Sequence, residues 1–187
     1  MNVKDHTWIV LFAALILASC GVSSSVDGTV TTLDYRWKPP SGWSTVVGQD
    51  RVVAVSAGDA AALQTDLTRL STDQIAIFMT PTQHLGGVSM KDFAPQYWRT
   101  VSWLEGGGDS VAPVDEWPLP SVAPVTLGEL SGVQYDALYR SMIWRRYMLE
   151  LTPEIALEVS IYIPPDHPGL EAALQSLETL KRVPAAR

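Results

Sequence analysis

The chain has one cysteine among 187 residues, so no disulfide can form within it. A thiolate metal site or an iron–sulfur cluster needs several cysteines and is excluded for the same reason. Histidine is almost as scarce, because only three are present and none stands in a His-Glu-x-x-His or similar ligand spacing. We therefore expect neither a metal site nor a cofactor.

Positive charge is also in short supply. The 13 lysines and arginines stand against 20 aspartates and glutamates, which gives a formal net charge of −7. Nucleic-acid binding needs a positively charged face, and electrostatic attachment to anionic lipid head groups needs one too. The charge balance argues against both, and we expect no nucleic acid as a partner.

Motifs for catalysis are missing. The sequence contains no Gly-x-Ser-x-Gly elbow for a serine nucleophile, and Gly106–Gly108 lack the strand-loop-helix order and the lysine of a phosphate-binding loop. His84 and His167 are far apart, and a loop residue and a helix start explain them more simply than a ligand or a base does. We predict that the protein is not an enzyme and has no catalytic residue.

No apolar run approaches the roughly 20 residues that a bilayer-spanning helix needs, but a shorter run lies near the start of the chain. Trp8–Leu17 is free of charge, follows Lys4 and leads to the small residues Ala18 and Ser19. This pattern is typical of a signal peptide. Leu17-Ala18-Ser19-Cys20 resembles a bacterial lipobox. The resemblance implies that the Cys20 thiol takes a diacylglyceryl group and that the chain is cut before it.

Two alternatives remain: an ordinary secretory signal in which Cys20 is incidental, and a buried free thiol in a cytosolic protein. On the lipoprotein interpretation, residues 1–19 are the signal peptide and the mature chain begins at Cys20. Acyl chains then hold it, because each buried methylene contributes about 0.8 kcal/mol. We expect the protein to be lipid-anchored in the cell membrane or the outer membrane, facing the periplasm or the cell exterior.

Composition divides the mature chain simply. Residues 20–30 are small and polar, with Ser23, Ser24 and Ser25 in a row, and are predicted to be a flexible tether. Residues 31–183 have the size of a single globular domain, and 184–187 form a C-terminal tail.

Alternating and β-branched residues predict strands over 33–38, 51–56, 75–80, 125–139, 142–151 and 155–163. We expect Pro81 to end the third of these and Gly132 to bend the fourth. In the last, Leu157, Val159 and Ile161 alternate with polar residues, which predicts one covered face.

Helical spacing predicts three helices. The first follows an Asp59 cap and carries Leu63, Leu67 and Leu70, and the second covers 89–104 with Pro95 in its first turn behind an Asp92 cap. Gly106–Gly108 are expected to stop the second helix. The third closes the chain, with Leu170, Leu174, Leu177 and Lys181 along one face.

The elements together predict an α+β fold, a mostly antiparallel sheet covered by helices. Their order resembles the PsbP and DcrB group of small α/β/α sandwich domains, many of which are lipid-anchored. The resemblance covers residues 30–183 and implies an accessory or assembly role at a membrane complex, although a fold does not by itself give a function. It is carried by Tyr35, Trp37, Pro40, Gly42 and Trp43 at the start, and by Gly132, Ile155–Tyr162 and Leu170–Leu180 at the end.

Candidate contact residues lie in the Pro-rich stretch 113–124, which is predicted to be a long surface connection. Trp117 stands there between prolines and is expected to be exposed, with Asp115 and Glu116 beside it. An exposed tryptophan is a plausible anchor for a partner. Asp109, Asp115 and Glu116 could also bind a hard cation, but a solvated acidic loop is the simpler explanation.

Three arginines, Arg140, Arg145 and Arg146, could hold an anion near one hairpin, although the last two point to opposite sides of a strand. Pairing with Glu150 or Glu158 explains them more simply.

The preferred hypothesis is a lipid-anchored extracytoplasmic accessory or assembly protein that binds an envelope protein. The alternative is a carrier of a small apolar or anionic ligand in a cleft between sheet and helices. A hydrolase would need His84 or His167 beside a carboxylate and a nucleophile.

Overall fold

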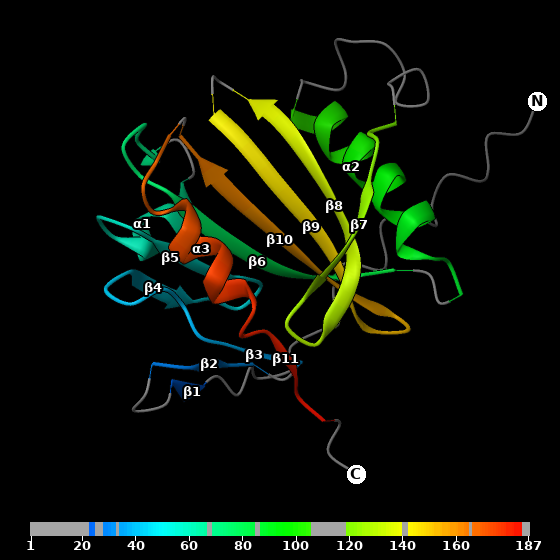
Figure 1. Ribbon diagram of the computed structural model, residues 1–187, viewed down its shortest axis with the longest axis horizontal. Helices are drawn as coiled ribbons and strands as arrows, with labels where there is room; N and C mark the ends of the chain where they lie inside the picture. Colours follow the sequence, from blue (N-terminus) through cyan, green and yellow to red (C-terminus); the bar gives the residue numbers. More distant parts are fainter. Residues whose placement is uncertain are drawn as a thin grey trace, which may run out of the picture.

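A computed structural model of the chain describes residues 23–24, 28–32, 34–66, 69–84, 87–105, 119–139, 142–164 and 166–184. Within these residues the chain forms two antiparallel sheets and three helices, which confirms the α+β prediction (Figure 1). The strands are β1 (Ser23–Ser24), β2 (Val30–Thr31), β3 (Tyr35–Trp37), β4 (Ser44–Val47), β5 (Val52–Val55), β6 (Ala76–Gln83), β7 (Ala123–Leu127), β8 (Leu130–Tyr139), β9 (Met142–Thr152), β10 (Ile155–Ile163) and β11 (Lys181–Arg182). The helices are α1 (Ala60–Thr65), α2 (Met90–Glu105) and α3 (Leu170–Leu177).

The main sheet has seven strands in the order β4-β5-β6-β10-β9-β8-β7. Its centre is the meander β8–β9–β10, whose strands follow one another in the chain and pair as neighbours. Hairpins of this kind need only short turns, such as the one at Pro153–Glu154 that leads from β9 into β10. The meander predicted from the alternating residues is therefore present.

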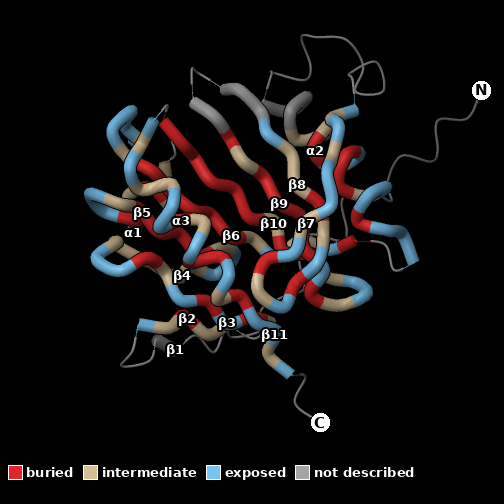
Figure 2. Tube along the Cα trace, viewed as in Figure 1, coloured by how far each residue is buried: buried red, intermediate tan, exposed pale blue. Residues whose placement is uncertain are grey.

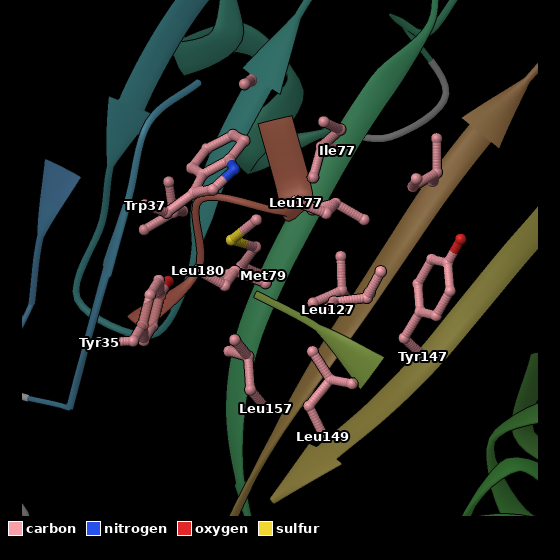
Figure 3. Packing of buried hydrophobic residues seen from close by; sticks show 14 of the residues in the cluster. Tyr35, Trp37, Ile77, Met79, Leu127, Tyr147, Leu149, Leu157, Leu177 and Leu180 are labelled. Atoms are coloured by element: carbon pink, nitrogen blue, oxygen red, sulfur yellow. The ribbon is translucent and has the colours of Figure 1, made fainter. Parts of the chain in front are cut away.

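A second sheet of four short strands, in the order β1-β2-β3-β11, packs against one face of the main sheet together with α3. We call it the small sheet. Figure 3 shows Tyr35 and Trp37 of β3, with Leu177 of α3 and Leu180 after it, beside Met79 of β6. Tyr35 and Trp37 are fully buried, whereas Arg36 between them is exposed, as the alternation predicts.

The opposite face of the main sheet is covered by α1 and α2, which pack on two separate hydrophobic clusters. Strand β10 is consequently buried on both faces and not on one, as Figure 2 shows for the central strands. Ser160 and Tyr162 were expected on an open face but are only 6 % and 7 % exposed. The sequence pattern could not show this because polar and aromatic residues fill the second face.

Two prolines lie inside strands, where the sequence predicted none. Strand β6 continues through Pro81 to Gln83, although Pro81 was expected to end it. Pro81 pairs with Leu157 of β10. On its other side Pro81 has no partner in β5, because the pairing of β6 with β5 goes no further than Met79. Pro124, expected in a loop, belongs to the edge strand β7. Both positions tolerate a residue that lacks an N–H, because no neighbouring strand needs it.

Glycines explain a second difference. The predicted single strand 125–139 is two strands, β7 and β8, joined by a turn at Gly128 and Glu129. Gly128 has a φ of +57°, which favours glycine. Gly132, expected at a bend, lies in β8, where an added Cβ would be 1.9 Å from the Met148 carbonyl oxygen. A glycine is needed there for close approach of two backbones.

The helices also differ in their ends. The cap of α2 is Ser89, whose hydroxyl accepts from the Asp92 N–H at 3.3 Å and donates to the Asp92 carboxylate at 2.7 Å. Pro95 therefore falls in the second turn and not in the first. The Asp59 cap of α1 is confirmed, since its carboxylate accepts from the Ala61 N–H at 2.9 Å.

Two helices are shorter than predicted. Helix α1 ends at Thr65, before Leu70, which still packs on the same cluster. Helix α3 ends at Leu177, and Lys181, expected on its face, lies in β11. None of the helices in the described ranges is long and apolar enough to cross a membrane.

Candidate binding site

A partly buried polar cluster joins α2 to the main sheet. Glu158 of β10 accepts a hydrogen bond from the Tyr97 hydroxyl at 2.9 Å and another from the Trp98 indole N–H at 3.2 Å. Each carboxylate oxygen thus has one donor from α2. Because both donors come from one helix, the cluster fixes the helix on the sheet, and this structural role accounts for Glu158.

Tyr97 acts in this cluster as a hydrogen-bond donor. Burial, followed by the negative charge of Glu158, raises the pKa of Tyr97 to about 12, although Arg146 opposes the shift. The phenol therefore keeps its proton at neutral pH. Such a group can orient a carboxylate but cannot serve as a general base under these conditions.

The two neighbouring arginines of β9 are separated by the sheet, as predicted. Arg146 is 4 % exposed, and its guanidinium carbon lies 4.5 Å from the centre of the Trp144 ring. Arg145 forms a two-pronged ion pair with Asp136 of β8, at 2.9 and 3.0 Å. The partner of Arg145 is therefore not Glu150 or Glu158, and the two guanidinium groups do not converge on one anion.

The two histidines of the described chain have structural contacts. The His84 backbone N–H donates to the Glu154 carbonyl oxygen at 3.0 Å, and its ring lies 5.3 Å from that of Phe93. In His167, Nδ1 accepts from the Gly169 N–H at 2.9 Å, and Nε2 lies 3.1 Å from the Asp73 carbonyl oxygen. Among the described residues no three His, Cys, Asp or Glu side chains lie close enough to bind a metal ion.

A hollow lies between the small sheet and strand β4. It encloses about 880 Å³ and is lined by Val30 of β2, by Trp43 and by Thr45 and Val47 of β4. We call it the β4 groove. Lys38 stands at its rim, exposed to solvent. Binding sites for small molecules measure roughly 300–1,000 Å³, so the groove has the size of a binding site.

One wall of the groove is a sheet edge with which no strand of the described residues pairs. Strand β4 ends the strand order of the main sheet, so β5 is its one strand partner in the described part of the chain. Its sequence, Ser44–Val47, has neither charge nor proline. Edge strands usually carry a charged residue or a proline, because their free N–H and C=O groups would otherwise recruit another strand. Strand β7, at the opposite edge, is protected in this way by Pro124.

The groove owes its shape to the turn between β3 and β4. Pro39 and Pro40 end β3, and the Trp43 N–H donates to the Pro40 carbonyl oxygen at 3.3 Å. Gly42 has a φ of +81°, so it supplies the left-handed backbone that this turn requires. The ring of Trp43 is half-buried, packed partly on the core and partly facing the groove.

A second cavity lies nearby and is far smaller. It encloses about 70 Å³ beside Tyr35, Val52 and Pro81. The Tyr35 hydroxyl is buried there without a hydrogen-bond partner in the described chain, and burial, followed by the charge of Asp34, raises its pKa. The volume is too small for a ligand of ordinary size.

The predicted site residues Cys20, Asp115, Glu116 and Trp117 lie outside the described residues, as do Gly106–Gly108, Asp109 and Arg140. The β4 groove was not predicted. The β-branched run Thr45–Val47, one residue after the Pro-Pro-Ser-Gly-Trp turn, is typical of a strand and could have revealed the edge strand β4, although not the groove beside it.

Comparisons with known proteins give little. No protein-family model matches the chain, and no curated protein does. A crystal structure of a protein from Bacteroides thetaiotaomicron is similar, with a TM-score of 0.43 and 12 % identity. The match covers 80 % of this chain and 45 % of that one, so this chain corresponds to less than half of the other protein.

Proposed function

We propose that the protein is a lipid-anchored, extracytoplasmic accessory protein that binds an extended segment of an envelope protein in the β4 groove. The observation that carries this proposal is a groove of about 880 Å³ that runs along a strand edge with no partner strand in the described part of the chain. A bound segment in extended conformation can pair with the N–H and C=O groups on the outer edge of β4, while the groove accepts alternate side chains. Trp43 offers the aromatic contact that dominates many interfaces.

Photo-crosslinking tests this binding mode directly. A photoreactive amino acid replaces Ser41, which is exposed at the groove rim, and the control carries it at Thr72, an exposed residue of the turn before β6. Cells are irradiated, and the adducts are identified by mass spectrometry. We expect a discrete adduct from position 41 that is absent from position 72. Identical adducts from the two positions would refute binding in the groove.

A substitution gives an independent test. Trp43→Ala should abolish the adduct from position 41, because the substitution removes the aromatic wall. Tyr135→Ala is the matched control, since Tyr135 is a half-buried aromatic residue packed under α2 on the other face of the main sheet. Thermal unfolding is used to check that both variants fold. Retention of the adduct in folded Trp43→Ala would contradict the proposal.

The anchoring part of the proposal rests on the signal peptide and on Cys20. We expect the wild-type protein to carry acyl mass and to sediment with membranes, and Cys20→Ser to do neither. Intact mass and membrane fractionation measure both properties. Soluble, unmodified wild-type protein would overturn the anchoring while leaving the crosslinking result unaffected.

A small ligand is the alternative occupant of the groove. Its volume lies within the range of small-molecule sites, and the exposed Lys38 at the rim would favour an anionic group. On this alternative the protein is a carrier, and native mass spectrometry of the freshly purified protein would show a retained small molecule. A bound mass that disappears in Trp43→Ala would favour the carrier over the partner protein.

We also propose kinship with the PsbP and DcrB group. It is supported by the buried Tyr35 and Trp37 near the start, by the meander β8–β10 and by the closing helix α3. The main sheet has helices on both faces, which fits an α/β/α sandwich. A non-enzymatic accessory role is what this kinship would imply.

A further inference from the structure

The small sheet differs in charge from the rest of the chain. Its four strands contain no carboxylate and three cationic side chains, which are Arg36, Lys181 and Arg182. The whole chain, in contrast, has a net charge of −7. Arg36 of β3 and Lys181 of β11 are direct partners across the ladder, and both are exposed. Like charges in such a pair destabilise a sheet. Folding does not account for this arrangement, whereas an anionic surface facing the small sheet would.

The cations lie on the outer side of the small sheet. Tyr35 and Trp37 point into the core, so Arg36 between them points outward, and its partner Lys181 projects on the same side. Lys38, two residues after Arg36, is also exposed and extends the row. We call Arg36, Lys38 and Lys181 the basic face.

Carboxylates near the basic face do not cancel it. Glu129 lies 3.9 Å from the Lys181 amino group, and both side chains are more than half exposed, so water and salt screen this contact. Asp34 precedes β3 and is half-buried. Three positive charges thus stand against two negative ones in a chain that is otherwise strongly acidic.

The small sheet is also the part of the fold nearest in sequence to Cys20. Strand β1 begins at Ser23, three residues after Cys20, and Ser23 is paired with Thr31 of β2. Three extended residues span at most about 10 Å. A lipid on Cys20 therefore holds the small sheet at the membrane surface.

We infer that the basic face lies against the anionic head groups of the membrane that holds the lipid. This inference rests on the proposed anchoring through Cys20. Each lysine or arginine close to an anionic leaflet strengthens association roughly fivefold, and the effect extends over about a Debye length, 8 Å at physiological salt. The acidic remainder of the chain is repelled by the same surface, so the two effects together orient the domain. Val30 and Lys38 also line the β4 groove, which then opens close to the bilayer.

The test uses the full-length, acylated protein in vesicles of phosphatidylcholine, with or without phosphatidylglycerol. A fluorophore is attached to Thr31→Cys, beside Arg36 on β2, or to the control Thr72→Cys, and head-group spin labels act as quenchers. We expect quenching at position 31 and none at position 72. The position-31 signal should require phosphatidylglycerol and be lost at high salt.

A charge variant completes the design. Arg36→Gln, Lys38→Gln and Lys181→Gln together should abolish the quenching at position 31, whereas a variant with Arg51, Arg69 and Lys91 changed to Gln, of equal net charge, should retain it. If the acylated protein shows equal quenching at both positions, or if the first variant leaves the quenching unchanged, the contact of the basic face with head groups is refuted while the anchoring stands. Absence of acyl mass would refute the anchoring and, with it, the inference.

Discussion

The Tyr97 hydroxyl and the Glu158 carboxylate form a 2.9 Å hydrogen bond between residues 61 positions apart in the chain, and this bond holds α2 on the main sheet. Hydrogen bonds to charged groups contribute about 1.5–3 kcal/mol, so Tyr97→Phe should lower the free energy of unfolding by about that amount. Urea unfolding measures the loss. The control is Tyr135→Phe, which removes a hydroxyl from the same face of the sheet. Equal losses for the two variants would show that the Glu158 contact is not special.

The same hydroxyl predicts an alkaline limit to stability. Its pKa is about 12 in the folded protein against 10.0 for an ordinary tyrosine. Because the folded-state pKa is raised, the contribution of Tyr97 is complete below pH 10 and is lost as the pH rises from 10 to 12. Urea unfolding across this range should show a steeper decline for wild type than for Tyr97→Phe. Parallel declines would contradict the assignment, since the remaining tyrosines are common to both proteins.

Two glycines with positive φ allow a test of close packing. Gly42→Ala and Gly128→Ala each place a side chain in the left-handed region of the backbone. This conformation should lower the free energy of unfolding by about 1–2 kcal/mol. An added Cβ meets nothing within 4 Å at Gly42, but at Gly128 it would lie 2.2 Å from the Leu180 carbonyl oxygen. We expect Gly128→Ala to be clearly the more destabilised of the two in thermal unfolding. Equal shifts of the unfolding temperature would mean that the backbone around Leu180 moves aside without a loss of stability.

The ion pair between Arg145 and Asp136 should matter little in spite of its good geometry. The two side chains are 29 % and 50 % exposed, and pairs of this kind contribute about 0–1 kcal/mol. Asp136→Asn should therefore change the free energy of unfolding by less than about 1 kcal/mol. A loss that approaches that of Tyr97→Phe would show that this pair is shielded from solvent screening.

The meander and the buried aromatic residues of β3 could be predicted from the sequence because local alternation encodes them. Leu157, Val159 and Ile161 mark β10 in any context, and Trp37 lies between two exposed cations. The second covered face of β10 could not be predicted, since it depends on α1 and α2 packing over the clusters that contain Tyr162 and Ala156. Tertiary contacts decide that burial.

The same reasoning explains the errors at prolines and at chain ends. Pro81 and Pro124 look like terminators, yet each is tolerated because its strand has a partner strand on one side only at that position. Strand β11 has two residues and is defined by its pairing with β3 across the whole length of the chain. The β4 groove depends on that small sheet, so local patterns could not place it.

The sequence and the structure suggest different contacts for the partner. The sequence suggests Trp117, and the structure suggests Trp43. Trp117 stands between prolines with Asp115 and Glu116, and Trp43 lines the β4 groove. Pull-down from solubilised membranes should lose the partner in Trp43→Ala, because in the proposed binding mode the groove supplies the main contact. If the Pro-rich stretch adds a second contact, Trp117→Ala should lower the recovered amount without abolishing it. A partner list for Trp117→Ala identical in composition and amount to that of wild type would count against any role of Trp117, while leaving the groove as the docking site.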